Sequence, residues 1–221
     1  MSERSSLFAG RVRHTAAPGL PPGGVEGPRR RILEAALTLF ARRGFHGTSV
    51  RDLADVLEQQ PSALYKHFPS KEHVLAALVQ HGYAMHHQTL LDGLLTVGAS
   101  PVDQLHILVE VNARSHAQWP LLAIVVHEEL HALPEALLGP VVALRDASAA
   151  LLLRILQRGS AEGCFDVVDL PTTAAAIGAM GVRIPLWFHP GLGLDIDTMA
   201  HRQALLALRM VGATTSSKAS R

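Results

Sequence analysis

The sequence RRRILEAALTLFARRGFHGTSVRDLADVLEQQPSALYKHFPSKEHVL, residues 29–75, decides the fold class of this chain. Its first part places apolar side chains from Ile32 to Phe40 at i, i+3, i+4, i+7 and i+8, the spacing of an amphipathic helix. Gly44 stops that helix, because glycine is favoured in the left-handed position just after a helix end. The stretch therefore begins with one amphipathic helix.

Two short helices follow, and a tight break separates them. Thr48 suits the N-cap of the earlier one. The letters EQQ interrupt that helix, and Pro61 opens the later one, PSALYKHF, since proline is favoured at the first helical position. Pro69 ends it, and Ser70 caps a longer helix. An amphipathic helix followed by two short helices and a tight turn predicts a helix-turn-helix unit.

The rest of the chain is also predicted to be helical, because no stretch shows the sustained alternation of a half-buried strand. We predict helices over residues 71–95, 100–118, 120–133, 134–162, 172–185 and 195–212. The expected fold is all-α, with a three-helix helix-turn-helix DNA-binding domain and a larger helical domain for ligand binding and dimerisation. The predicted boundaries are a flexible basic arm over 1–28, the DNA-binding domain over 29–72, the helical domain over 73–212 and a loose tail over 213–221.

Charge and composition favour a polyanionic partner for the first third of the chain. Residues 1–71 hold 11 Lys and Arg against 6 Asp and Glu, whereas residues 72–221 hold 9 against 13. The single cysteine, Cys164, excludes an internal disulfide and fits a reducing compartment. The sequence shows neither a secretory signal nor a membrane span, so we expect a cytoplasmic protein with no membrane partner.

Residues 29–75 resemble the N-terminal domain of the TetR family of bacterial transcriptional regulators. The matching residues are Ile32, Ala35–Ala36, Phe40, Gly44–Phe45, Thr48, Leu53–Ala54, Leu64–Tyr65, His67–Phe68 and Ser70–Lys71–Glu72. The resemblance implies a DNA-binding regulator, a repressor that binds a palindromic operator as a dimer and is released by a small hydrophobic effector. The chain departs from the family pattern in the turn, where a glycine is usual at Glu58, a small apolar residue at Gln59 and a Ser or Thr cap at Gln60.

The second short helix is the predicted recognition helix, because the first residues of such a helix face base edges in the major groove. Its hydroxyl, ammonium and imidazole groups can contact bases or phosphates, while two helix N-termini nearby favour a phosphate. The predicted DNA-binding residues are Thr48, Pro61, Ser62, Ala63, Tyr65, Lys66, His67 and Lys71. Arg11, Arg13 and Arg29–Arg31 are further candidates for phosphates or a minor groove.

The family resemblance implies a dimer through the last two long helices. Ala174, Gly178 and Gly181 share one helix face and permit close approach of another helix. Met199, Leu206 and Met210 form an apolar stripe that suits a partner chain, although the stripe is equally consistent with the core of one chain. The sequence leaves these two interpretations open.

The acidic helical region is predicted to hold an effector, because its apolar interior carries a few polar groups. Residues 127–165 are similar to the C-terminal domain of family members that sense fatty-acyl or steroid-derived acyl-CoA thioesters. The candidate effector-binding residues are His106, Arg114, Trp119, His127, His131, Arg145, Arg183 and Trp187. Asn112 and His116 belong to the wider set of polar groups in this region.

The stretch HEELH, residues 127–131, has the spelling of a zinc peptidase helix. His189 or His201 could supply a third ligand, but Ala132–Leu133–Pro134 follows instead of the glycine-containing extension. The chain also has 13 histidines, so a five-letter match arises easily. We therefore predict no enzyme, no cofactor and no metal. A regulator that responds to metal or pH through histidines, or a zinc hydrolase, remains the alternative.

Overall fold

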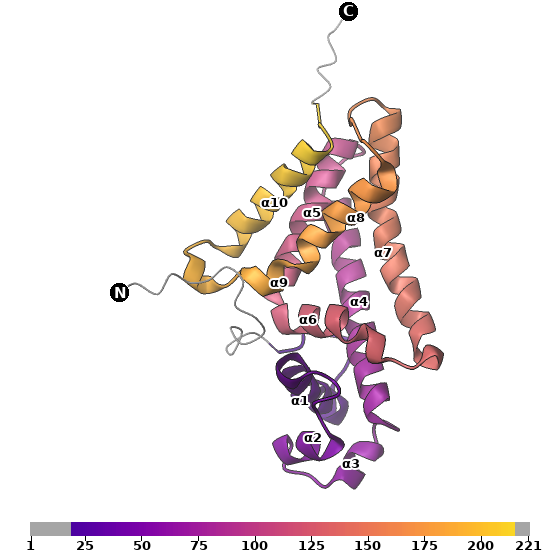
Figure 1. Ribbon diagram of the computed structural model, residues 1–221, viewed down its shortest axis with the longest axis vertical. Coiled ribbons are helices and arrows are strands. Elements are labelled where there is room, and N and C mark those ends of the chain that lie inside the picture. The colour runs from indigo at the N-terminus through magenta and orange to yellow at the C-terminus, as the bar shows by residue number, and fades with distance from the viewer. Residues whose placement is uncertain (1–18, 215–221) are drawn as a thin grey trace, which may run out of the picture.

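The computed structural model describes residues 19–214, and within this range every regular element is a helix (Figure 1). The α-helices are α1 Gly27–Arg43, α2 Val50–Val56, α3 Pro61–Tyr65, α4 Lys71–Leu95, α5 Pro101–Gln118, α6 Pro120–Glu128, α7 Glu135–Ala161, α8 Leu170–Val182, α9 Ile184–Trp187 and α10 Ile196–Met210, and two 3₁₀ turns are η2 Leu130–Ala132 and η3 Pro190–Leu192. The prediction of an all-α fold is confirmed. Arg11, Arg13, most of the predicted arm and most of the predicted tail lie outside the described residues.

Helices α1, α2 and α3 gather at one end of the molecule, and α4 leads from them into a larger bundle (Figure 1). There α4 packs beside α5 and α7, α8 crosses α5 and α7, and α10 lies along α5 (Figure 1). The short helix α6 packs against α1 on one side and against α4 and α9 on the other. Both α4 and α6 therefore touch the small N-terminal unit and the larger bundle.

The hydrophobic core of the N-terminal unit extends into the bundle. Phe40, Leu53 and Leu64 are buried in one apolar cluster, which also contains Leu122 and Val125 of α6. Burial of large apolar side chains is the main favourable term in folding, so this shared cluster holds α6 against α1–α3. The predicted boundary between residues 72 and 73 falls inside α4, which crosses from one domain to the other.

Two helix starts differ from the sequence prediction. Ser49, and not Thr48, caps α2, because the Ser49 hydroxyl accepts the Asp52 N–H while Asp52 accepts the Ser49 N–H. Thr48 is buried and its hydroxyl donates to the Gly44 carbonyl at 2.9 Å. Asp169 caps α8 by accepting the Thr172 N–H, so that helix begins at Leu170 and not at Thr172.

Helix α6 ends earlier than predicted. It stops at Glu128, and residues 130–132 form the separate 3₁₀ turn η2, so no single helix runs from residue 120 to 133. The stretch HEELH therefore does not lie on one helix, and its two histidines diverge. His127 is partly buried inside the bundle, whereas His131 is exposed.

Within residues 19–214, only α7 is long and apolar enough to cross a membrane by length and composition. This is weak support for a membrane span, because core helices of water-soluble proteins meet the same criterion. In this chain α7 packs against α4, α5 and α8, and it carries charged residues such as Arg145, Asp146 and Arg154. We therefore describe α7 as a helix of the bundle.

Candidate functional site

The turn between α2 and α3 is closed although it lacks glycine. Glu58 has φ 53°, the left-handed conformation in which glycine is usual. Backbone bonds from Gln59 N–H to the Ala54 carbonyl and from Ala63 N–H to the Gln60 carbonyl, both 2.9 Å, complete the connection. A side chain in this conformation costs about 1–2 kcal/mol, which the packed unit offsets through its buried core.

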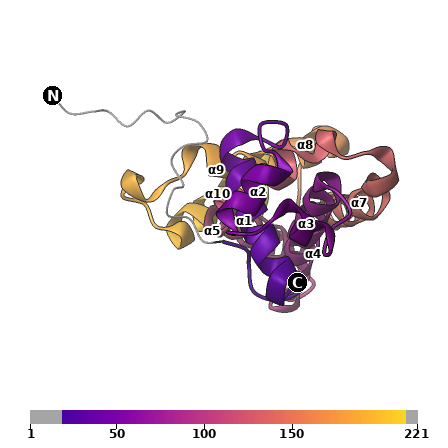
Figure 2. The same cartoon turned by 90° about the horizontal axis from the view of Figure 1, so that it is seen from below.

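Helix α3 presents one face to the core and the other to solvent, at the end of the molecule seen in Figure 2. Leu64 and Phe68 are buried. The remaining predicted contact residues of this segment are exposed (Ser62, Tyr65 and Lys66) or partly exposed (Pro61, Ala63 and His67). Their side chains are thus accessible to a partner molecule, and their contact with DNA stays a prediction.

Thr48 and Lys71 occupy different positions from those expected of free phosphate contacts. The Lys71 ammonium group donates to the carbonyls of Phe45 and Thr48 at 2.8 and 2.7 Å, and lies 4.1 Å from the centre of the Phe45 ring. These contacts of Lys71 hold the start of α4 against the loop between α1 and α2. Only one of its three ammonium donors remains for a phosphate, and the Thr48 side chain faces inward.

The arginines before the helix-turn-helix are also used inside the chain. Arg29 donates to the His67 carbonyl at 2.7 Å and lies over the Phe68 ring at 4.2 Å. Arg30 donates to the carbonyls of Leu20 and Pro21. These two hydrogen bonds hold the last part of the predicted arm against α1. The described part of that segment, residues 19–26, is therefore anchored to the first helix.

A cavity of about 170 Å³ lies among α4, α5, α7 and α8, next to the end of α6. Its wall is largely apolar and comes from residues on all four helices: Leu90, Leu108, Val109, Leu152, Ile177 and Val182. Its polar lining is Tyr83, His86, Asn112, His116, His127, Arg145 and Ser148. An apolar cavity with a few converging polar groups is the usual form of a small-molecule site.

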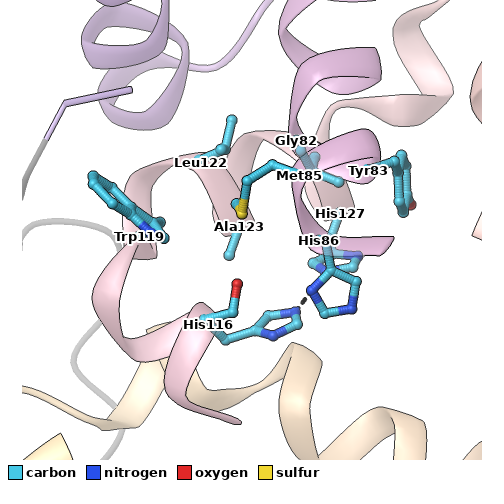
Figure 3. Close-up of a pocket in the computed structure, with 11 residues that line it drawn as sticks. Gly82, Tyr83, Met85, His86, His116, Trp119, Leu122, Ala123 and His127 are labelled. Atoms are coloured by element: carbon cyan, nitrogen blue, oxygen red, sulfur yellow. Dashed lines mark hydrogen bonds between the residues drawn. The ribbon is translucent and has the colours of Figure 1, made fainter. Parts of the chain in front are cut away.

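Three histidines connect this cavity to a smaller pocket of about 30 Å³, which Figure 3 shows. The Nε2 atoms of His116 and His127 are 3.0 Å apart, and their rings stack at 5.3 Å (Figure 3). His86 approaches His116 edge-on, with 5.2 Å between ring centres. The three imidazoles thus form one group, contributed by α4, α5 and α6.

The hydrogen bonds of this group fix its tautomers. His116 Nδ1 lies 2.8 Å from the Asn112 carbonyl, which can only accept, so Nδ1 carries the proton. His116 Nε2 must then accept from His127 Nε2–H. The remaining His127 Nδ1 is an acceptor without a proton. The pair therefore offers a ligand one free hydrogen-bond acceptor, His127 Nδ1.

Burial keeps these histidines uncharged. Desolvation, followed by the nearby His116, lowers the pKa of His86 and that of His127 to about 3. Burial also lowers the pKa of His116, although its bond to the Asn112 carbonyl opposes the shift. Arg145, at the exposed rim, is the permanently charged side chain among the residues lining the larger cavity.

The predicted effector residues divide into three groups. His127 and Arg145 line the larger cavity, and Trp119 lines the smaller one. Arg183 borders a separate surface pocket beside α6. The remaining four are absent from the linings of these pockets: His106, Arg114, His131 and Trp187. His106 and Arg114 face α10 instead, through Glu110, His201 and Asp197.

Sequence reasoning missed several lining residues on α4 and α7. Tyr83, His86 and Leu90 follow one face of α4 at i, i+3 and i+7. On α7, the missed residues Ser148 and Leu152 follow the predicted Arg145 at the same spacing. Helical periodicity therefore groups each set correctly. It does not show that the two faces meet across a cavity, because that depends on how the helices pack.

Helix α6 also joins the cavity to the DNA-binding unit. One residue after α6, the buried Glu129 accepts the backbone N–H of Phe45 at 3.2 Å. Phe45 is in turn held by Lys71 at the start of α4. The polar end of the cavity, at His127, is thus two residues away from a direct contact with the loop that precedes α2.

Comparison with known proteins agrees with this architecture. The family described as "Tetracyclin repressor-like, C-terminal domain" matches residues 98–211, and "Bacterial regulatory proteins, tetR family" matches residues 32–78. The chain is similar to the HTH-type transcriptional repressor KstR2 of Rhodococcus jostii (strain RHA1), with 25% identity over 88% of this chain and 96% of the relative.

Solved structures show the same arrangement of helices. A bacterial regulatory protein of the TetR family from Rhodococcus RHA1 superposes with a TM-score of 0.80 at 29% identity, over 86% of this chain and 100% of that one. AibR, solved in complex with isovaleryl coenzyme A and operator DNA, shares the fold with a TM-score of 0.75 at 24% identity, over 84% and 99% of the two chains. The chain belongs to the TetR family of bacterial transcriptional regulators.

Proposed function

We propose that this regulator is a cytoplasmic repressor that binds a palindromic operator as a dimer and leaves it when a small hydrophobic effector enters the cavity. The position of the cavity supports this most directly, because its lining includes residues of α4 and the end of α6, the two helices that also contact the DNA-binding unit. Relatives of similar length that are named transcriptional repressors support the direction of control.

The lining supports a particular chemistry for the proposed effector. The apolar wall suits a short aliphatic chain or a compact ring, and His127 Nδ1, the free acceptor of the neutral pair His116–His127, suits a hydroxyl group or another hydrogen-bond donor. Arg145 at the rim suits an anionic group that remains outside. An acyl-CoA thioester combines these features, with its acyl part inside and its phosphates outside. The structure of AibR with isovaleryl coenzyme A supports this class of ligand for the fold.

An effector releases the operator only if it binds the released conformation better than the DNA-bound one. The path from the cavity to the recognition helix is short in this chain. A ligand that moves His127 shifts the end of α6, and Glu129 carries that shift to Phe45. The reorientation of α2 and α3 relative to a partner's recognition helix then changes the fit to two successive major grooves.

Binding of purified protein to DNA from upstream of its own gene, followed by fluorescence anisotropy, tests the DNA-binding part. We expect tight binding that weakens with salt, prefers this DNA over a scrambled duplex, and saturates at two chains per operator. Lys66→Ala is expected to weaken it on the order of 10-fold. Arg154→Ala, which removes an exposed charge on α7, is the matched control. Equal, weak binding to both duplexes would contradict the proposal.

The alternative functions have less support from the geometry. A pH sensor needs a group that titrates near neutrality, whereas burial lowers the pKa of His86 and that of His127 to about 3. A zinc hydrolase of the HEELH type needs His127 and His131 on one helix face, but α6 ends between them. We therefore propose the repressor function over these alternatives.

A further inference from the structure

A second group of histidines lies outside the effector cavity, where α10 packs along α5 (Figure 1). His106 and Glu110 are one turn apart on α5, and His201 projects from α10 toward them. We propose that His106, Glu110 and His201 form a binding site for a divalent transition metal, with zinc as the expected occupant. The site has no part in the effector proposal and rests on different residues.

The distances suit a single ion. His106 Nδ1 is 3.5 Å and His201 Nδ1 is 3.7 Å from Glu110 Oε2, and the three ligand atoms all lie within 4.8 Å of one another. Zinc bonds of about 2.0–2.1 Å in tetrahedral geometry place neighbouring ligand atoms about 3.4 Å apart. His201 is exposed, so its side chain has room to rotate toward an ion held by His106 and Glu110.

The helices that carry these ligands are packed against each other. The α5 residues beside the site, Leu105 and Val109, are buried in the bundle. On α10, Ala200 and Ala204 flank His201 and are fully buried, so their small side chains let the two helices approach closely. The ligands therefore sit on two packed helices and not on loops, which favours a defined coordination geometry.

The surrounding charges also favour a cation. Arg114 donates to Glu110 Oε1 at 2.8 Å, which leaves Oε2 facing the two imidazoles. The same guanidinium group pairs with Asp197 of α10. The two carboxylates, of Glu110 and Asp197, outnumber the one guanidinium group that pairs with them. Arg114 thus orients the metal-binding carboxylate, the role that outer partners play in many metal sites.

The donor set selects the kind of ion. Two imidazoles and one carboxylate suit zinc and its neighbours cobalt and nickel, whereas magnesium and calcium prefer sites made of oxygen ligands. His201 is more than half exposed, so a water molecule can complete the coordination. A bound ion would fasten α10 to α5 and stabilise the folded chain.

Cobalt binding to the full-length protein without a histidine tag tests this site, because tetrahedral Co²⁺ is visible by its absorption. We expect one Co²⁺ per chain, displaced by Zn²⁺ but not by Mg²⁺, and a rise in melting temperature with Zn²⁺. His201→Ala and Glu110→Gln should each abolish stoichiometric binding, and Arg114→Gln should weaken it about 10-fold. His131→Ala, which removes an exposed histidine elsewhere, is the matched control.

Circular dichroism of the metal-free variants shows whether each one folds. His106→Ala removes the other imidazole ligand, the one on α5, and should also abolish stoichiometric binding. No Co²⁺ binding to the folded wild-type chain would overturn the proposal. So would binding that survives in His201→Ala and Glu110→Gln as it does in the His131→Ala control. Neither result depends on DNA or on an effector, so the test is separate from that of the repressor function.

Discussion

At the scale of single residues, the buried imidazoles have consequences that can be measured. His86 and His127 have a pKa of about 3 in the folded chain, against an ordinary value of 6.5. Between these two values the unfolded chain binds protons that the folded chain does not. The contribution of these two histidines to the free energy of unfolding is therefore fully present above about pH 6.5. It decreases as the pH falls from 6.5 toward 3.

We predict that this loss is on the order of 1 kcal/mol per pH unit for each of the two histidines within that window. Urea unfolding of the wild type and of His127→Phe at pH 7 and pH 5 measures it. The variant should lose less stability than the wild type between the two pH values. An equal loss in both proteins would show that His127 is already charged in the folded chain.

Glu58 offers a second test at this scale. Its left-handed conformation costs free energy that glycine would not require. Glu58→Gly should therefore stabilise the folded chain by about 0.5–1 kcal/mol, because the relieved strain exceeds the added freedom of the unfolded chain. Urea unfolding measures the change. Glu58→Ala retains the strain, so a similar gain in that variant would contradict the assignment.

At the scale of elements, the sequence predicted helix positions better than helix contacts. Pro61, Pro101 and Pro120 begin helices where expected, because the proline preference is local. Local patterns did not reveal that α6 stops at Glu128 or that Ser49 replaces Thr48 as the cap. Several of the expected effector residues lie outside the cavity for the same reason, since the packing of α4 against α7 decides which faces meet.

For the proposed dimer surface, too, local sequence patterns do not show which helix faces are buried within the chain. The sequence left open whether the stripe of Met199, Leu206 and Met210 faces a partner or the core of one chain. Met199 is buried in the chain's own core, while Leu206 and Met210 are exposed. Gly181 packs against the Asn112 side chain of α5, so its small size serves a contact within one chain. Sequence spacing could not separate these cases, because both kinds of surface need apolar or small residues.

Helices α4 and α6 cross closely at Gly82. A methyl group there would lie 2.5 Å from Val126 Cγ2 and 3.4 Å from Leu122. We predict that Gly82→Ala separates the helices and destabilises the chain by about 1–3 kcal/mol in urea unfolding. Gly139→Ala on α7, where no atom lies within 4 Å, should instead stabilise it by up to about 1 kcal/mol. Equal effects would show that the crossing tolerates a side chain.

The contact between Glu129 and Phe45 belongs to the same scale. Glu129→Ala leaves the Phe45 N–H without this partner and should cost about 1–3 kcal/mol of stability. It should also reduce the effect of an effector on operator affinity while the folded variant still binds DNA. Anisotropy titrations with and without the effector measure this coupling. Unchanged release would show that α6 does not transmit the signal through this contact.

At the scale of the whole molecule, the two parts of the chain differ in charge and in the site that each contains. The basic first third contains the helix-turn-helix, and the acidic remainder contains the cavity. Two helices, α4 and α6, contact both parts, and α6 shares a hydrophobic cluster with the helix-turn-helix, so they offer a route from the cavity to the DNA-binding unit. This continuity is the physical basis for the proposed control of DNA binding by an apolar ligand.

Gly178 provides a way to block the cavity without touching the DNA-binding unit. It lines the cavity, and no atom lies within 4 Å of a Cβ added there, so we expect Gly178→Leu to fold and to place its side chain in the cavity. The most direct measurement is release of operator DNA from the wild type and from Gly178→Leu by acyl-CoA thioesters of increasing chain length, with free coenzyme A as the control. We predict equal operator binding, with release from the wild type alone. Release from neither protein, or equal release from both, would contradict control through this cavity.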